Sequence, residues 1–339
     1  MQIIKDIFST ANKLFKSSVA FIVNLPSSIL KGKAWFKSYI KQFHYNLNNL
    51  SESNLKLGIY HLENRNFNDA IFRFKFVDKY LDKGNKEANY YLGCVYFMKN
   101  NYPQAVKYLE KGASEDKINL KQFIKQIDNV QQVPDDIYVF HRDINAEIFI
   151  DKFASDTKNL PQIIVQELLN TIEDLPDQYS ILDLGSNISI LGNELRRKMP
   201  DSFDLIRVEC SSEMIVLGEA CFPDVTIYDN THQTLPIKYV AETKEQYDVI
   251  VSLEGISYQA DLAPIFDNLY KVLKDNGYIA LCFKYSQSRS FSAKHLEFSY
   301  NEEQIVELLT ESGFTIQSKQ KIMLEIKNNY YIFIARKSI

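Results

Sequence analysis

The chain has 339 residues, more than one hydrophobic core usually holds, so at least two domains are expected. Its 45% apolar and 24% charged residues are typical of a soluble globular protein, and its net charge of −4 argues against general nucleic-acid binding. The cysteines stand far apart, with no histidine at ligand spacing, so we expect reduced thiols in a cytoplasmic protein and no metal site. They are Cys94, Cys210, Cys221 and Cys282.

The first fifty residues are basic, with seven lysines against the single acid Asp6. Apolar residues at helical spacing predict one helix over Ile3–Ile22 and a second over Lys33–Leu50, and Pro26 separates them. One interpretation is a helical cap on the next domain. The other is a peripheral helix on an anionic membrane surface. No apolar run reaches the roughly 18 residues of a membrane span.

Residues 51–130 repeat themselves with a displacement of 35 residues, since Leu57-Gly58 recurs as Leu92-Gly93 and Ala70 recurs as Ala105. Polar turns at 64–68 and 100–102 separate the expected helices, and helices near 33–50 and 118–130 are expected to cap them. The pattern resembles the tetratricopeptide repeat (TPR), a helix–turn–helix unit of about 34 residues. The resemblance implies a groove for a protein or peptide partner, and a spacer or dimerising element is the alternative.

A polar stretch with a proline, Gln131–Asp136, predicts the next domain boundary. The aromatic-rich segment Ile137–Ala154 and an amphipathic helix over Pro161–Leu175 follow it. The expected plan is therefore a basic helical segment at 1–50, TPR-like repeats at 51–130, a linker with lid helices at 131–178, and an α/β domain at 179–339.

The α/β domain opens with a strand, a turn and a helix. Ile181–Leu184 reads as a buried strand, Gly185 permits a tight turn, and Ile190–Met199 continues as a helix with a basic last turn. This arrangement is typical of nucleotide-binding sites, because the loop amides and the helix start face the ligand.

The rest of the chain alternates strands with helices, which predicts a doubly wound, mostly parallel sheet, while a short turn before the last strand predicts an antiparallel C-terminal hairpin. The expected strands are Phe203–Val208, Val225–Tyr228, Gln246–Ser252, Tyr278–Phe283, Thr315–Glu325 and Tyr330–Ala335; the expected helices are Ser212–Ala220, Leu262–Leu273 and Asn301–Gly313.

Short motifs lie within and between the predicted strands in a fixed order. They are Leu182-Asp183-Leu184-Gly185, Val208-Glu209-Cys210-Ser211, Asp229 before Leu235-Pro236, Tyr247-Asp248-Val249-Ile250, Val272 to Gly277, and Lys294-His295 to Tyr300. Together they resemble a class I S-adenosylmethionine-dependent methyltransferase over roughly Asp135 to the C-terminus. With the repeats, the chain most resembles bacterial predicted methyltransferases that carry an N-terminal TPR region. The resemblance implies a Rossmann-like seven-stranded domain.

The same resemblance implies S-adenosylmethionine as the cofactor. Glu209 would accept both ribose hydroxyls, Asp183 would orient the loop amides or meet the amino-acid end, and Asp229 would accept from the adenine amino group. Gly185 would let the backbone approach the cofactor closely. The implied cofactor-binding set is Asp183, Gly185, Asn187, Glu209, Cys210, Asp229 and Asn230.

The chain departs from the family pattern at two glycines, which are replaced by Asn187 and Ser189. Asparagine is the non-glycine residue that best tolerates a positive φ, so the turn can survive. The methyl acceptor is not written in the sequence, and Glu254, Tyr258 and His295 are candidates for acid–base or positioning groups, with structural roles as the alternative. Two functions stay open: an active methyltransferase whose repeats recruit a partner, and a catalytically inactive scaffold.

Overall fold

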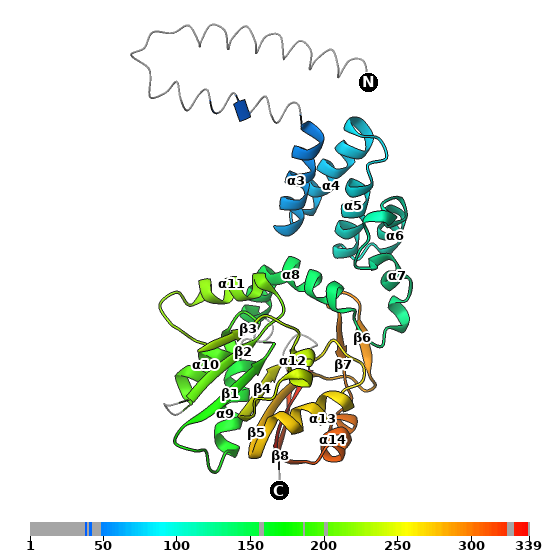
Figure 1. The fold of residues 1–339 in the computed structure, drawn as a ribbon. Coiled ribbons are helices and arrows are strands. Elements are labelled where there is room, and N and C mark those ends of the chain that lie inside the picture. Colours follow the sequence, from blue (N-terminus) through cyan, green and yellow to red (C-terminus); the bar gives the residue numbers. More distant parts are fainter. Residues whose placement is uncertain are drawn as a thin grey trace, which may run out of the picture. The chain divides into compact units, whose positions relative to one another are not determined.

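The computed structural model describes residues 38, 41–42, 49–155, 159–185, 187–199, 203–323 and 329–337. Contacts divide the chain into two compact units, Met1–Lys117 and Ile118–Ile339 (Figure 1). The helix expected over Ile3–Ile22, and most of the one expected over Lys33–Leu50, lie outside the described residues. Within the described ranges, no helix combines the length and the apolar character needed to cross a bilayer.

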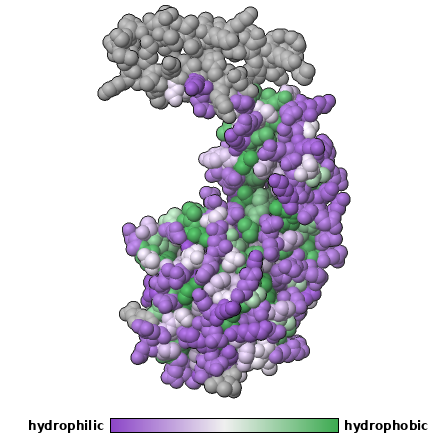
Figure 2. Space-filling model, in the orientation of Figure 1, coloured by the Kyte–Doolittle hydropathy of each residue, from purple (hydrophilic) through white to green (hydrophobic). Residues whose placement is uncertain are grey.

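In its described residues, the first unit contains two helical hairpins. Its helices are α3 (Leu50–Glu63), α4 (Phe67–Phe76), α5 (Lys86–Met98) and α6 (Tyr102–Lys111), with the short helical turns η2 (Val77–Leu81) and η3 (Ala113–Glu115). Helix α3 packs on α4, α4 on α5, and α5 on α6. The helix–turn–helix pattern and both intervening turns expected from the sequence are therefore confirmed. Figure 2 shows hydrophobic residues gathered along these helices in an otherwise hydrophilic surface.

Two glycines explain how the helices of each hairpin approach. A Cβ built on Gly58 would lie 2.5 Å from the Phe74 ring, and one built on Gly93 would lie 2.5 Å from Leu109 Cγ. Both glycines and both partners are related by the same displacement of 35 residues. Because a β-carbon does not fit at either place, the repeated glycine fixes the helix spacing of both hairpins.

The second unit begins earlier than expected, at Ile118 rather than at Gln131–Asp136. The segment before α8 is held by this unit: the Val133 N–H donates to the Tyr258 carbonyl (3.3 Å), and the Ala260 N–H donates to the Gln131 carbonyl (2.9 Å). Residues 118–130, expected as a cap on the repeats, therefore cluster with the α/β unit. Its first helical elements are α7 (Leu120–Lys125), η4 (Ile127–Asn129), α8 (Asp135–Ser155) and α9 (Leu160–Thr171).

A seven-stranded sheet forms the core of the second unit, in the order β3-β2-β1-β4-β5-β9-β8. Strands β1 to β5 pair in parallel, and β9 runs antiparallel to both β5 and β8, so the predicted sheet and C-terminal hairpin are confirmed. The strands are β1 (Tyr179–Leu184), β2 (Phe203–Val208), β3 (Asn230–His232), β4 (Tyr247–Leu253), β5 (Leu273–Lys284), β8 (Phe314–Met323) and β9 (Asn329–Lys337).

Helices cover both faces of the sheet (Figure 1). One face packs against α9, α10 (Ile190–Lys198) and α11 (Ser212–Cys221). The other face packs against α12 (Pro236–Glu242), α13 (Ala263–Val272) and α14 (Glu302–Glu311). This two-sided cover explains why the parallel strands read as continuous apolar runs in the sequence.

The third strand was predicted at the wrong place. Val225–Tyr228, expected as a strand, is not one, and β3 instead covers Asn230–His232. The reason is that β3 is a short strand at the sheet edge with polar, mostly exposed residues, whereas the apolar Val225 is 52% exposed. The sequence analysis also missed α12 and a small hairpin of β6 (Ser290–Ser292) and β7 (Glu297–Ser299).

Candidate functional site

The strand order reverses between β1 and β4, which places a topological switch point at the carboxyl ends of these strands. In open α/β sheets, ligands bind in the crevice at such a point. Asp183 lies near the end of β1, Gly185 follows β1, Glu209 follows β2 and Glu254 follows β4. We call these residues, with Asn187, the carboxyl-edge site.

The loop after β1 has an unusual backbone. Gly185, Asn187 and Ser189 have φ values of 74°, 50° and 64°. The expectation that Asn187 tolerates a positive φ is therefore confirmed. Its side chain also donates from Nδ2 to the Leu253 carbonyl (3.1 Å), and its backbone N–H donates to Glu209 Oε2 (3.2 Å). Asparagine thus ties the β1 loop to the end of β4, which a glycine could not do.

Ser189, the second replacement for a glycine, is accommodated by a glycine on the neighbouring helix. A Cβ built on Gly218 of α11 would lie 2.3 Å from Ser189 Oγ. Arg207 donates from Nη1 to the same oxygen (3.4 Å). These residues also border a cavity of about 290 Å³ between α11, strands β2 and β3, and the loop 222–228. The structure therefore makes room for the serine on the side of α11.

Glu209 is 1% exposed, and both of its carboxylate oxygens are hydrogen-bonded. Arg142 of α8 donates from Nε to Oε1 (3.2 Å) and from Nη2 to Oε2 (2.8 Å). The Ser211 N–H (3.0 Å) and Cys210 Sγ (3.6 Å) also donate to Oε1. Burial lowers the pKa of Arg142, but Glu209, Tyr138 and Cys210 together raise it above its ordinary value, so the guanidinium is charged. A carboxylate has about four lone-pair sites, and these donors together with the Asn187 N–H fill them.

Asp183 is fully buried and only partly hydrogen-bonded. Its Oδ2 accepts from the Tyr228 hydroxyl (2.7 Å). Within the described part of the chain, its Oδ1 has no hydrogen-bond partner. Burial and then the negative charge of Glu209 raise the pKa of Asp183 to about 7, although Tyr228 and Arg207 oppose the rise. A buried acceptor without a donor at the end of β1 fits a ligand that brings a donor, such as an amino group.

The raised pKa of Asp183 predicts a pH-dependent stability. Between about pH 4 and pH 7 the folded protein keeps a proton that the unfolded chain loses, so the free energy of unfolding falls as the pH rises. Asp183→Asn removes this titration. In urea denaturation, we expect the free energy of unfolding of the variant minus that of the wild type to increase as the pH rises from about 4 to 7. A constant difference would contradict a raised pKa.

The structure brings together only part of the sequence-predicted set. Asp183, Gly185, Asn187, Glu209 and Cys210 gather at the carboxyl edge, as described above. Asp229 and Asn230 do not, because they stand at the beginning of β3, the end opposite to this edge. The Asp229 carboxylate instead pairs with Arg196 and accepts from the Leu205 N–H (2.7 Å). The expectation that Asp229 follows the third strand is wrong.

The three candidates for acid–base or positioning groups lie in different environments. Glu254 is buried directly after β4 with φ 62°. Tyr258 is 1% exposed, accepts from the Ile237 N–H (3.4 Å), and has its pKa raised by burial. His295 is half-buried in the turn between β6 and β7. Of the three, only Glu254 is positioned directly at the end of a switch-point strand.

Helix α8 supplies site residues that the sequence analysis missed. Besides Arg142, Tyr138 stacks on Tyr258 with ring centroids 4.1 Å apart, and Asp143 accepts from the Ser211 hydroxyl (2.6 Å). The segment was recognised only as aromatic-rich and as a lid. No local pattern marks Arg142, because its partner Glu209 lies 67 positions away.

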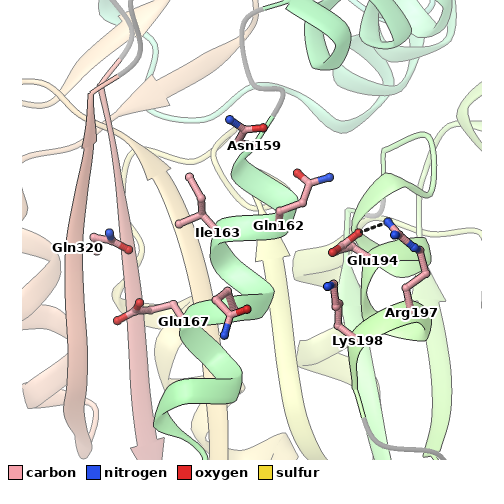
Figure 3. Close-up of a pocket in the computed structure, with 9 residues that line it drawn as sticks. Asn159, Gln162, Ile163, Glu167, Glu194, Arg197, Lys198 and Gln320 are labelled. Carbon is pink, nitrogen blue, oxygen red and sulfur yellow. Dashed lines mark hydrogen bonds and ion pairs between the residues drawn. The ribbon is translucent and has the colours of Figure 1, made fainter.

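A separate cavity of about 590 Å³ lies between α9, α10 and β8 (Figure 3). Its lining is polar: Gln162 and Glu167 come from α9, Glu194 and Arg197 from α10, and Gln320 from β8. It contains no residue of the carboxyl-edge site.

Part of the chain is similar to known methyltransferases. Residues 153–319 match the family model described as a methyltransferase domain. A putative S-adenosylmethionine-dependent methyltransferase from Listeria monocytogenes is 16% identical, covering 52% of this chain and 98% of that chain, with a TM-score of 0.41. An S-adenosylmethionine-dependent methyltransferase from Clostridium acetobutylicum is 16% identical, covering 57% and 99%, with a TM-score of 0.42.

A third similar structure is the 1,6-didemethyltoxoflavin-N1-methyltransferase of Burkholderia thailandensis with bound 1,6-didemethyltoxoflavin and S-adenosylhomocysteine. It is 15% identical, covering 57% of this chain and 84% of that chain, with a TM-score of 0.44. No curated protein matches the chain. The α/β unit is a Rossmann-like domain, and its residues 153–319 match the methyltransferase family model. The match supports S-adenosylmethionine as its cofactor.

Proposed function

We propose that the chain is an S-adenosylmethionine-dependent methyltransferase. The observation that carries the proposal is the pair of buried carboxylates, Asp183 and Glu209, at the carboxyl ends of β1 and β2 beside the switch point. Glu209 suits the two ribose hydroxyls, and the unpaired Oδ1 of Asp183 suits the amino group. The cofactor would supply an electrophilic methyl group, and the protein would contribute binding and orientation.

Calorimetric titration of the full chain with S-adenosylhomocysteine tests this function. We expect binding, and we expect Glu209→Gln to weaken it by about tenfold to a hundredfold, because a charged acceptor of hydrogen bonds contributes about 1.5–3 kcal/mol. The matched control is Glu219→Gln, whose side chain is 68% exposed and pairs with Arg207 away from the site. Equal affinity of wild type and Glu209→Gln would contradict the assignment of Glu209, and absence of binding would contradict the function.

The acceptor of the methyl group stays undefined, but the structure ranks the candidates for acid–base or positioning groups. Tyr258 is a poor general base near neutral pH, because burial holds its pKa above the ordinary value and its ring is stacked on Tyr138. Glu254 is the residue we favour for contact with the acceptor, because it follows β4 directly at the switch point.

The helical hairpins are proposed to be TPR-like and to bind a peptide or protein partner. Exposed apolar and aromatic side chains on α3, α4 and η2 support this role, since such residues are enriched at interfaces. They are Leu57 (43%), Tyr60 (57%), Phe72 (61%) and Tyr80 (46%). A photo-crosslinking residue at Phe72 should capture a cellular protein that the same residue at the exposed Lys107 does not. Identical capture profiles would contradict the proposal.

The alternative function, a methyltransferase-like scaffold without catalysis, is favoured by one observation: Arg142 already donates one hydrogen bond to each carboxylate oxygen of Glu209. It predicts that neither the wild type nor a variant lacking Arg142 binds S-adenosylhomocysteine. The two functions are therefore separated by the same titration.

A further inference from the structure

Arg142 takes the place at Glu209 that a ribose would need. Its Nε and Nη2 each donate to a different oxygen of the carboxylate, as the two adjacent hydroxyls of a ribose would. The remaining donors to Glu209 come from residues of the β1 loop and the β2 end, which belong to the site itself. A ribose can therefore reach the acceptors of Glu209 only if Arg142 leaves them.

Arg142 cannot leave alone, because it is 4% exposed and its charge would remain buried without a counter-ion. Its Nη2 also donates to Asn187 Oδ1 (3.0 Å), and its Nη1 donates to the Tyr138 hydroxyl (3.4 Å). The guanidinium would reach water only if α8 moved away from the carboxyl edge. Helix α8 also contacts the site through the Asp143–Ser211 hydrogen bond and the Tyr138–Tyr258 stack. It buries Ile137, Ile144 and Ala146 as well, so its movement must expose apolar side chains.

The turns after β1 and β4, which lie beneath α8, also contact each other. A Cβ built on Gly185 would lie 2.3 Å from Gly255 Cα, so the turns after β1 and β4 are in direct contact. Ser252 Oγ donates to the Leu184 carbonyl (2.9 Å), and Asn187 adds its bond to Leu253. The described conformation is thus closed at the switch point as well as at Glu209.

We infer that Arg142 is a displaceable counter-ion of Glu209, and that the cofactor binds by exchanging its ribose for this guanidinium while α8 moves outward. The inference rests on the proposed function. The closed state keeps the buried Glu209 neutralised when the cofactor is absent. The closed state also lowers the apparent affinity for the cofactor, because only the fraction of molecules with α8 displaced can bind it.

The test compares S-adenosylhomocysteine binding by wild type, Arg142→Met and the matched control Arg207→Met. Arg207 is also buried (2% exposed), but it pairs with Glu219 and does not contact Glu209. We expect Arg142→Met to bind about tenfold or more tightly than wild type, and Arg207→Met to show no such gain. Adenosine should show the same gain, because it has the ribose hydroxyls but no amino-acid end.

Several results would overturn the inference. If Arg142 instead binds the cofactor carboxylate, Arg142→Met weakens S-adenosylhomocysteine binding and leaves adenosine binding unchanged. If wild type binds and Arg142→Met binds equally, the inference fails while the proposed function stands. If neither protein binds, both fail.

A measurement on the wild type alone covers the case in which Arg142→Met does not fold. Amide hydrogen exchange with and without S-adenosylhomocysteine should show faster exchange across residues 136–149 of α8, together with protection of residues 187–190 and 209–211. Slower exchange or no change across α8 on binding would overturn the inference.

Discussion

Replacing Arg142 alone by methionine is expected to lower the free energy of unfolding of the α/β unit by about 3–5 kcal/mol, because it leaves the Glu209 carboxylate buried without its counter-ion. Glu209→Leu is expected to have a similar effect, because it leaves the Arg142 guanidinium buried without its counter-ion. The side chains of the pair are only 5% and 1% exposed, so water cannot compensate either charge.

The double variant Arg142→Met/Glu209→Leu should recover most of this loss, because replacing a buried ion pair by apolar side chains is often neutral or stabilising. Urea denaturation of the four proteins measures the coupling. Lys319→Met is the control, since Lys319 and Glu302 pair while 43% and 25% exposed, and its loss should cost no more than about 1 kcal/mol. Additive effects of the two single variants would show that Arg142 and Glu209 do not interact as described.

Gly255→Ala is expected to destabilise the α/β unit by about 3 kcal/mol, near the upper end of the usual cost of overpacking. A Cβ at this position would lie 1.9 Å from the Leu184 carbonyl oxygen and 2.7 Å from Gly185 Cα, which are both backbone atoms at the end of β1. Neither can rotate away, so the turns after β1 and β4 must separate.

Gly218→Ala is the matched control for Gly255→Ala. Its Cβ would also meet a close neighbour, but that neighbour is the side-chain oxygen of Ser189 at 2.3 Å, which can rotate. The alanine also favours helix α11 by about 1 kcal/mol. We therefore expect a clearly smaller loss than for Gly255→Ala in thermal or urea denaturation. Equal losses would contradict the contact between the two turns.

The sequence was sufficient for the parts of the fold that depend on local pattern. Buried parallel strands give apolar runs, so β1, β2 and β4 were located with small errors in their ends. Strand β5 was also located, but it begins at Leu273, five residues earlier than predicted. The Asp248 motif was also recognised, and the structure gives it a structural role: its carboxylate accepts from the Ser180 N–H (2.8 Å) and from Lys274 Nζ (2.7 Å). Strand β3 was misplaced because a short polar strand at a sheet edge carries no such pattern.

Only part of the candidate site could be predicted from the sequence. Asp183, Gly185, Asn187 and Glu209 follow strand ends, and the topology of a parallel sheet gathers such positions at one edge. Arg142 lies in a helix that crosses this edge from outside the strand–helix alternation. Which residue of α8 meets Glu209 depends on tertiary packing, and that cannot be read from spacing along the chain.

A crystal structure of the full chain with S-adenosylhomocysteine is the most direct test of the carboxyl-edge site. We predict that the two ribose hydroxyls bind the Glu209 carboxylate, that the amino group lies within hydrogen-bond distance of Asp183 Oδ1, and that Arg142 is withdrawn from Glu209. Ligand bound elsewhere while the Arg142–Glu209 pair remains intact would contradict this account.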